Sequence, residues 1–501
     1  MRRLLLLTLI VLPLALYAGN FTITLQAPAY SGQVARLYRY DDLFTLRTVR
    51  IAEMPIGDDG TATLNADLQG VTKMQLRIGD VSGDLFARPG TTLNILFPLP
   101  ATRTARSLGK TTRVDLEFRD LDALDLNALA TDLNERVDAF IAEDLATDQA
   151  AGMQAVGVRR SNDAPPDTTA PERPATLFVT PVLSQARADS FELKLRRFYA
   201  EVNDPWFPHY LDNSMAGLHQ GMHVSDKATF ERWIKGRTVH YDDPEQVRFL
   251  RSFFADLLPA FVVRYHDAAL QKALAERNTD SLKAIFSKHD FLRDNDRLCE
   301  LMAMDQLYLQ YHAKYLDRPA VKELLTKWST GSAYPEHRRM AANMLWDRTA
   351  MQPGSQLPAM LLENERGQRV DLDSLLNGPV CLVITASWCT YCELELAGLE
   401  QLQQTYKDHV RIIAISLDST LTALRAYRKA HPGQEFLWLH AQAEQQLRED
   451  LRLRSLPTFY MLNDGVLAHS PAPLPSKGLG AVFQQVQVAN ERDGRIKVWD
   501  D

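Results

Sequence analysis

The sequence predicts a multidomain protein with an N-terminal antiparallel β domain, a central all-α region and a C-terminal α/β domain. Three patterns predict these regions in turn: alternating apolar and polar residues, apolar residues at helical spacing, and unbroken apolar runs separated by helical stretches. We place the three regions at residues 19–105, 106–352 and 353–501. The length of 501 residues also favours two to four domains over one.

The N-terminus has the layout of a secretory signal peptide. Two arginines follow Met1, an apolar stretch occupies residues 4–16, and small residues stand at Ala18 and Gly19. This stretch is shorter than the ~20 apolar residues that a membrane-spanning helix needs, and no cysteine follows it for lipid attachment. We therefore expect residues 1–18 to be cleaved, leaving a periplasmic protein that is neither a lipoprotein nor embedded in the membrane.

The charge and the cysteine content exclude several classes of function. The 56 basic and 63 acidic residues give a net charge of -7 and are spread along the chain, without the basic stripe that attracts nucleic-acid phosphates. We therefore expect no nucleic-acid partner. The four cysteines, Cys299, Cys381, Cys389 and Cys392, are too few for a disulfide scaffold of this size, and the last two form one Cys-x-x-Cys motif.

The first two regions carry little that points to chemistry. Alternating segments such as 21–25 and 74–78 predict half-buried strands, with a turn signal at 57–60 between them. Helical spacing follows, for example from Leu250 to Phe261. A stretch rich in Pro, Asp and Thr near residues 161–174 interrupts the helical pattern, and we expect it to form an exposed, mobile loop.

Two histidines and two isolated cysteines are further candidates for site residues. On a helix His219 and His223 would share one face, as in His-Glu-x-x-His metal sites, but the glutamate is missing and Gly221 weakens the helix. We expect two ordinary polar histidines and no metal site. Cys299, amid helical sequence, and Cys381, inside a buried strand, are expected to pack as small hydrophobic residues.

The pattern of the last region, residues 353–501, predicts a sheet covered by helices. Residues 360–370 predict a hairpin with Gly367 at its turn, and an unbroken apolar run over residues 379–386 is typical of a strand buried on both faces. Helical stretches separate it from further apolar runs, which cover residues 410–417, 435–439 and 458–462.

The cysteine pair stands directly after the buried strand and opens a helix, because Leu396 and Leu399 follow at helical spacing. Unpaired N–H groups and the positive end of the helix dipole stabilise a thiolate at this position. We expect Cys389, nearer the terminus, to be the more acidic and more exposed sulfur and to attack disulfides, and Cys392 to resolve the mixed disulfide. A structural zinc site would need two further ligands, and the domain offers no second cysteine or histidine pair.

A proline later in the domain makes the motif more specific. Pro457 immediately precedes the apolar run at residues 458–462, and a proline at this place belongs at the start of a strand, with a cis peptide bond as one option. Together, the hairpin, the buried strand, Trp388 with its Cys-x-x-Cys, and Pro457 resemble the TlpA/ResA branch of the thioredoxin superfamily. The resemblance covers roughly residues 357–490 and implies a thioredoxin-like fold for the C-terminal domain.

The resemblance also implies roles for individual residues. It makes Cys389 the nucleophile, Cys392 the resolving thiol and Pro457 the cis-proline at which substrates dock, with Trp388 and Leu456 beside it. No separate cofactor is implied, because the redox-active group is the Cys389–Cys392 disulfide itself. The preceding β and helical regions are similar, more loosely, to those of exported bacterial relatives.

The chain departs from the family in two places. The dipeptide Thr390-Tyr391 lacks the proline that is common before the second cysteine, and Val383 stands where thioredoxin carries a buried aspartate. A glutamate of the family is matched by Glu395, three residues beyond Cys392. We expect partial burial to raise the pKa of Glu395 above the usual ~4.3, so that it relays protons to Cys392.

These observations favour a periplasmic enzyme that reduces disulfides of client proteins with electrons from a membrane thiol donor. The resemblance implies clients such as cytochrome c apoproteins. An oxidase or isomerase is the second hypothesis, since the same fold spans potentials of about -270 to -120 mV. The third is a partner-binding protein with an accessory redox domain, because a long β and helical sequence precedes that domain.

Overall fold

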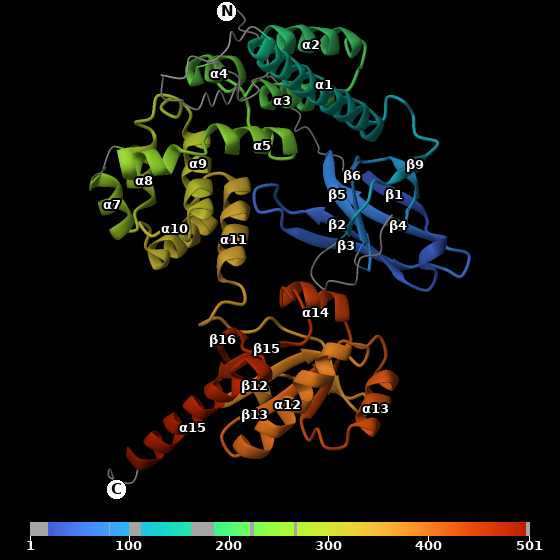
Figure 1. Ribbon diagram of the computed structural model, residues 1–501, viewed down its shortest axis with the longest axis vertical. Coiled ribbons are helices and arrows are strands. Elements are labelled where there is room, and N and C mark those ends of the chain that lie inside the picture. Colours follow the sequence, from blue (N-terminus) through green and yellow to red (C-terminus); the bar gives the residue numbers. More distant parts are fainter. Residues whose placement is uncertain are drawn as a thin grey trace, which may run out of the picture. The chain divides into compact units, whose positions relative to one another are not determined.

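The structure is a computed structural model (Figure 1). It describes residues 19–79, 81–99, 112–161, 185–220, 225–264 and 268–496. The predicted signal peptide, His223 and all but the first residue of the predicted Pro-rich loop lie outside these ranges. In the described ranges, no helix combines the length and the apolar character that crossing a bilayer requires.

The chain divides into two compact units. The N-terminal unit contains most of the β region together with the helices up to Leu345, and the main part of the C-terminal unit begins at Trp346. The β and helical regions, predicted as separate domains, therefore pack into one unit. Asn343 of the last helix donates hydrogen bonds of 2.7 Å to both Asp41 and Asp42, and buried side chains of the β region join the helical core.

Short strands with alternating burial make up the β region. They are β1 (Gly19–Gln26), β2 (Val34–Tyr40), β3 (Thr48–Pro55), β4 (Thr61–Leu68), β5 (Thr72–Ile78), β6 (Val81–Ala87), β7 (Thr92–Leu96), β8 (Thr112–Arg113) and β9 (Glu117–Arg119). The sheets have the orders β4-β1-β7-β9 and β3-β2-β5-β6-β8. Antiparallel pairing is confirmed for pairs such as β1 with β4, whereas β1 runs parallel to β7 and β6 parallel to β8.

The predicted helical region is confirmed. Its helices are α1 (Leu126–Ser161), α2 (Gln185–Phe198), α3 (Phe207–His219), α4 (Asp226–Trp233), α5 (Pro244–Phe253), α6 (Leu257–Pro259), α7 (Ala268–Ala275), α8 (Thr279–Phe286), α9 (Asp296–Leu309), α10 (Arg318–Gly331) and α11 (Pro335–Thr349). Side chains of Asn278, Asn295 and Asp317 cap α8, α9 and α10 by accepting backbone N–H groups of the first turn. Every residue from Leu298 to Tyr308 is buried, so α9 lies at the centre of the helices.

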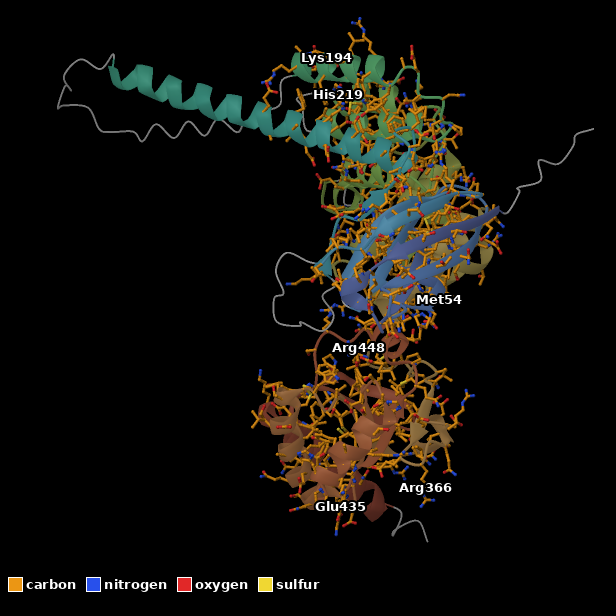
Figure 2. The ribbon with its side chains drawn as sticks, turned by 90° about the vertical axis from the view of Figure 1, so that its right-hand side faces the viewer. Met54, Lys194, His219, Arg366, Glu435 and Arg448 are labelled. Atoms are coloured by element: carbon orange, nitrogen blue, oxygen red, sulfur yellow. A yellow bond between two sulfur atoms is a disulfide. The ribbon has the colours of Figure 1, made fainter. Side chains whose placement is uncertain are left out.

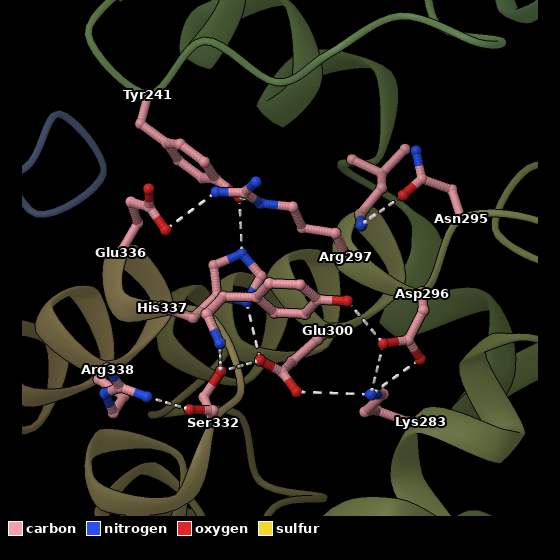
Figure 3. Close-up of polar contacts among 12 residues, drawn as sticks. Tyr241, Lys283, Asn295, Asp296, Arg297, Glu300, Ser332, Glu336, His337 and Arg338 are labelled. Atoms are coloured by element: carbon pink, nitrogen blue, oxygen red, sulfur yellow. Dashed lines mark hydrogen bonds and ion pairs between the residues drawn. The ribbon is translucent and has the colours of Figure 1, made fainter. Parts of the chain in front are cut away.

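A buried polar network connects α8, α9 and α11 (Figure 3). The Tyr241 hydroxyl lies 2.8 Å from Nε2 of His337, and Nδ1 of His337 lies 2.8 Å from a carboxylate oxygen of Glu300. Burial disfavours the Glu300 anion, but hydrogen bonds from His337 and Ser332 hold the pKa of this carboxyl below its usual range. Lys283 adds an ion pair of 3.5 Å. His337 is fully buried, so the network acts inside the helix packing.

The C-terminal unit is an α/β layer structure. Its elements are β10 (Leu362–Asn364), β11 (Arg369–Val370), β12 (Pro379–Thr385), α12 (Thr390–Tyr406), β13 (Arg411–Ser416), α13 (Leu421–Ala430), β14 (Leu437–Ala441), α14 (Glu444–Asp450), β15 (Thr458–Asn463), β16 (Val466–Ala472) and α15 (Leu479–Ile496), with a short 3-10 turn at Pro475–Lys477. The sheet order is β11-β10-β14-β13-β12-β15-β16. β12 lies between parallel β13 and antiparallel β15, and α12 packs beside α15.

The predicted elements of this unit are confirmed with small shifts. The hairpin forms from β10 and β11, with Gly367 at positive φ in its turn. The four apolar runs became β12, β13, β14 and β15. Val380 to Thr385 are all buried, as expected for a strand covered on both faces. β16, at the sheet edge, was not predicted, because residues 466–472 contain polar residues and a proline.

Candidate active site

The cysteine pair forms a disulfide at the N-terminus of α12. Cys389 and Cys392 are bonded to each other with their Cα atoms 5.3 Å apart. Cys389 is the N-cap residue of α12, and its sulfur accepts the backbone N–H of Cys392 at 3.2 Å. The predicted placement at a helix start is therefore confirmed. An N–H group directed at sulfur at the positive end of the helix dipole stabilises negative charge there once the disulfide is reduced.

The two sulfurs differ in accessibility. Cys392 is buried with 1% of its surface exposed, whereas Cys389 is partly exposed. Two aromatic side chains beside them are exposed on the surface: Trp388 is 43% and Tyr391 48% exposed. The Arg448 guanidinium stacks over the Trp388 ring at 5.7 Å. An incoming disulfide can therefore reach Cys389 before Cys392.

The strand register brings the predicted proline to the same edge of the sheet. Ile384 of β12 pairs with Thr458 of β15, so Pro457 lies beside the end of β12 that leads into the cysteine turn. The Leu456–Pro457 peptide bond is cis, which was one of the options open from the sequence. Leu456, which precedes the cis bond, is buried.

Glu395 lies one turn beyond Cys392, and its carboxylate is held by other groups. The hydroxyl and the amide of Ser476 donate hydrogen bonds of 2.6 and 3.1 Å, and the Tyr391 hydroxyl donates one of 3.1 Å. Burial favours the neutral acid, but these hydrogen bonds outweigh it and lower the pKa of Glu395. The expected rise in its pKa is therefore wrong. Among the described residues, neither cysteine is hydrogen-bonded to this carboxylate.

The other two cysteines are buried and free, as expected. Burial raises the pKa of Cys299 to about 12 and raises the pKa of Cys381 further. Both thiols therefore stay protonated at neutral pH and are poor nucleophiles.

One buried carboxylate near the cysteines was missed. Asp418 follows β13 and accepts hydrogen bonds from the amide and the hydroxyl of Ser387, two residues before Cys389. The sequence held a signal for it, because a polar residue directly after a buried parallel strand lies at the carboxyl edge of the sheet, where sites of α/β proteins gather. Among the described residues, the buried polar side chains at this edge include Thr385, Ser416, Asp418 and His440.

His219 is buried in the N-terminal unit, where Figure 2 labels it. Its Nε2 lies 2.8 Å from Glu192 and 3.9 Å from Asp189, so these three side chains are close enough to share one cation. Arg196 and Arg232 already bind Glu192 at 2.8 and 2.7 Å. Since their charge satisfies the carboxylate, the cluster is an ion-pair network.

Comparison with known proteins agrees with this geometry. Residues 377–465 match a family model described as thioredoxin-like. The C-terminal unit contains a thioredoxin-like domain. The thioredoxin-like protein YneN of Bacillus subtilis is 25% identical over 114 residues, which are 23% of this chain and 67% of that protein. The thiol-disulfide oxidoreductase ResA of Bacillus cereus is 30% identical over 86 residues, 17% of this chain and 50% of ResA.

The chain thus spans about half to two thirds of these curated relatives. Among solved structures, a putative thiol-disulfide oxidoreductase from Bacteroides vulgatus aligns with this chain at 21% identity and a TM-score of 0.26. The alignment covers 28% of this chain and 99% of the Bacteroides vulgatus chain. A thioredoxin-like protein from Bacteroides caccae aligns with 13% identity and a TM-score of 0.28. This alignment covers 65% of this chain and 99% of the Bacteroides caccae chain. The matched relatives confirm the predicted resemblance of the thioredoxin-like domain to thiol-disulfide oxidoreductases.

Proposed function

We propose that this protein reduces disulfides of client proteins through the Cys389–Cys392 dithiol. The observation that carries the proposal is the disulfide at the start of α12, with a reachable Cys389 and a buried Cys392. This arrangement suits a nucleophile that meets the client and a second thiol that acts only within the protein.

In the first step the Cys389 thiolate attacks one sulfur of a client disulfide. The client S–S bond breaks, a bond forms between Cys389 and the attacked sulfur, and the other client sulfur leaves as a thiolate. The helix dipole and the N–H of Cys392 lower the energy of the attacking thiolate.

In the second step Cys392 attacks the sulfur of Cys389. The mixed disulfide breaks, the Cys389–Cys392 bond forms, and the proton of Cys392 passes to the departing client thiolate. The client has gained two electrons and the pair has lost two. An external dithiol must then reduce the pair, and a membrane thiol donor is the proposed source.

Client binding uses the edge of the sheet around the disulfide. Trp388 offers exposed apolar surface, and Leu456 and Pro457 place their backbone beside the end of β12. Glu395 has a positioning role: its carboxylate accepts hydrogen bonds from Tyr391 and Ser476 and so connects the start of α12 to the turn that contains Ser476.

The proposed compartment is the periplasm. The layout of residues 1–18 supports export, since a charged start, a short apolar stretch and small residues precede Gly19. In such an oxidising compartment, a reductase keeps selected client cysteines reduced.

Trapping tests the proposed roles. Cys392→Ser, incubated with a disulfide-bearing client, should accumulate a mixed disulfide that non-reducing electrophoresis detects, because the second step is blocked. Cys389→Ser should give none and should lose turnover of a model disulfide to background. Equal trapping by both variants, or trapping by neither, would contradict the assigned roles.

The direction of the reaction is tested by the reduction potential, measured by equilibration with glutathione. A reductase should lie toward the thioredoxin end of the family's span, near -270 mV, and an oxidase toward -120 mV. A value at the oxidising end would overturn the reducing direction and leave the trapping result unchanged.

A further inference from the structure

A buried carboxylate supports the turn that delivers Cys389. Asp418 is 2% exposed. Its Oδ1 accepts the amide of Ser387 at 3.0 Å and the hydroxyl of Ser387 at 2.7 Å, and its Oδ2 accepts the hydroxyl of Ser416 at 2.6 Å. One side chain thus ties the end of β13 to the loop that leaves β12.

The tied residue stands inside the active-site turn. The amide of Cys389 donates to the carbonyl of Ala386 at 3.1 Å, which closes a four-residue turn with Ser387 at its second position. Because Asp418 holds both the backbone and the side chain of Ser387, it fixes the orientation of this turn. Cys389 is the last residue of the turn and the cap of α12.

The surroundings leave the carboxylate without a cationic partner. Among the described residues, no arginine or lysine forms an ion pair with Asp418; its partners are one amide and two hydroxyls. Nε2 of His440, from β14, lies 2.9 Å from the backbone oxygen of Asp418, while its Nδ1 faces Glu363 of β10. Asp418 also raises the pKa of Tyr427 on α13, although burial is the larger cause. The side chain of Asp418 thus accepts three hydrogen bonds, two from Ser387 and one from Ser416.

We propose that Asp418 positions the active-site turn and, through its buried negative charge, makes the cysteine pair a stronger reductant. A fixed negative charge close to a thiolate disfavours the thiolate and so favours the disulfide over the dithiol. This inference rests on the proposed function, because it names a residue that sets the strength of that reductant.

Asp418→Asn tests the charge. Asparagine is close to isosteric, and its oxygen still accepts from Ser387. The full chain is equilibrated with mixtures of reduced and oxidised glutathione, in which one protein disulfide and two glutathiones exchange with the dithiol and one glutathione disulfide. The expected result is about a tenfold shift toward the dithiol, equal to ~30 mV in potential. The alkylation rate of Cys389 should also reach half of its maximum at a lower pH than in the wild type.

Two further variants separate charge from positioning. Ser387→Ala keeps the charge but loses a hydrogen bond in the turn, so thiol-disulfide exchange should slow at least threefold without the shift toward the dithiol. Asp464→Asn is the matched control, because Asp464 also accepts a backbone N–H in a turn, that of Gly378 at 2.8 Å, at the opposite end of β12. It should change neither quantity.

The outcomes distinguish an electrostatic role of Asp418 from a purely structural one. If Asp418→Asn is folded and keeps the wild-type equilibrium constant within twofold, the carboxylate is purely structural and the inference is overturned. If Asp418→Asn does not fold, Ser387→Ala decides, and an unchanged exchange rate overturns the positioning role. If the wild-type chain shows no reversible equilibrium with glutathione at all, it is the proposed function that fails.

Discussion

Buried polar groups have different roles in the two units of this protein. In the N-terminal unit buried carboxylates contact basic side chains, as in the pairs Glu300 with His337 and Asp305 with Arg251. In the C-terminal unit the strand β12 is apolar from Val380 to Ile384, and several buried polar groups, Asp418 among them, lie where the strands β12 and β13 end.

The difference lies in what the polar groups hold. The Tyr241–His337–Glu300 chain connects three side chains in the manner of a catalytic relay, yet its histidine is fully buried and its partners are other structural groups (Figure 3). Asp418 is equally buried, but it holds a turn that presents a sulfur to solvent. Burial and hydrogen bonding alone therefore do not identify a reactive site; the accessibility of the group being held does.

Removing His337 should produce the largest change in stability. His337→Ala leaves the Glu300 carboxylate buried without its main partner, and breaking a buried pair costs about 3 to 5 kcal/mol. Denaturant unfolding of the N-terminal unit should shift accordingly, while the glutathione equilibrium of the cysteine pair stays at its wild-type value. A changed equilibrium would show that the helical network also serves the redox site.

Acid should weaken the N-terminal unit through Glu192. Burial opposes its ionisation, but hydrogen bonds from His219 and Arg196 hold the pKa of Glu192 at about 2, below its ordinary 4.5. A lowered pKa stabilises the folded state above about pH 4.5, and this contribution is lost as the pH falls toward 2. The loss should reach about 3 kcal/mol. Glu192→Gln should be less stable at pH 7 and should flatten the acid limb of unfolding free energy against pH.

The smallest effect is expected at Glu395. Glu395→Gln places an amide where the Ser476 N–H now donates, so the unfolding free energy of the C-terminal unit should fall by about 1 to 2 kcal/mol. Exchange should slow only a few-fold, and its pH profile should keep its shape, because a carboxyl with a lowered pKa is already ionised at neutral pH. Glu393→Gln, on the same helix and exposed, is the control. A changed pH profile in Glu395→Gln alone would restore the proton relay.

The local pattern of the C-terminal unit was readable from the sequence, because each buried strand is an unbroken apolar run and the cysteine pair follows one of them directly. The parallel pairing of β1 with β7 was not readable, since alternation fixes which side chains face the core and says nothing of strand direction. The joining of the β region to the helices was equally hidden. It depends on contacts such as Asn343 with Asp41, some 300 residues apart.

Sequence reasoning erred at Glu395 for a related reason. The helical spacing correctly predicted burial of its side chain, but the sign of the pKa shift is set by Ser476, which belongs to a turn far along the chain. Asp418 was not predicted for the same reason. Its contact with Ser387 depends on the parallel pairing of Thr385 with Ser416, which the sequence does not reveal.

The burial of Cys299 and Cys381 has a consequence for the chemistry of the whole chain. An unfolded chain presents four equivalent thiols, any of which can be oxidised or form a wrong pairing. Once folded, two of them are enclosed in separate cores and remain protonated, so that an electrophile or an oxidant in solution meets only the pair at α12. Folding thus shields Cys299 and Cys381 from reagents in solution. The number of thiols that are alkylated in the native, reduced protein therefore reports on the Cys389–Cys392 pair alone.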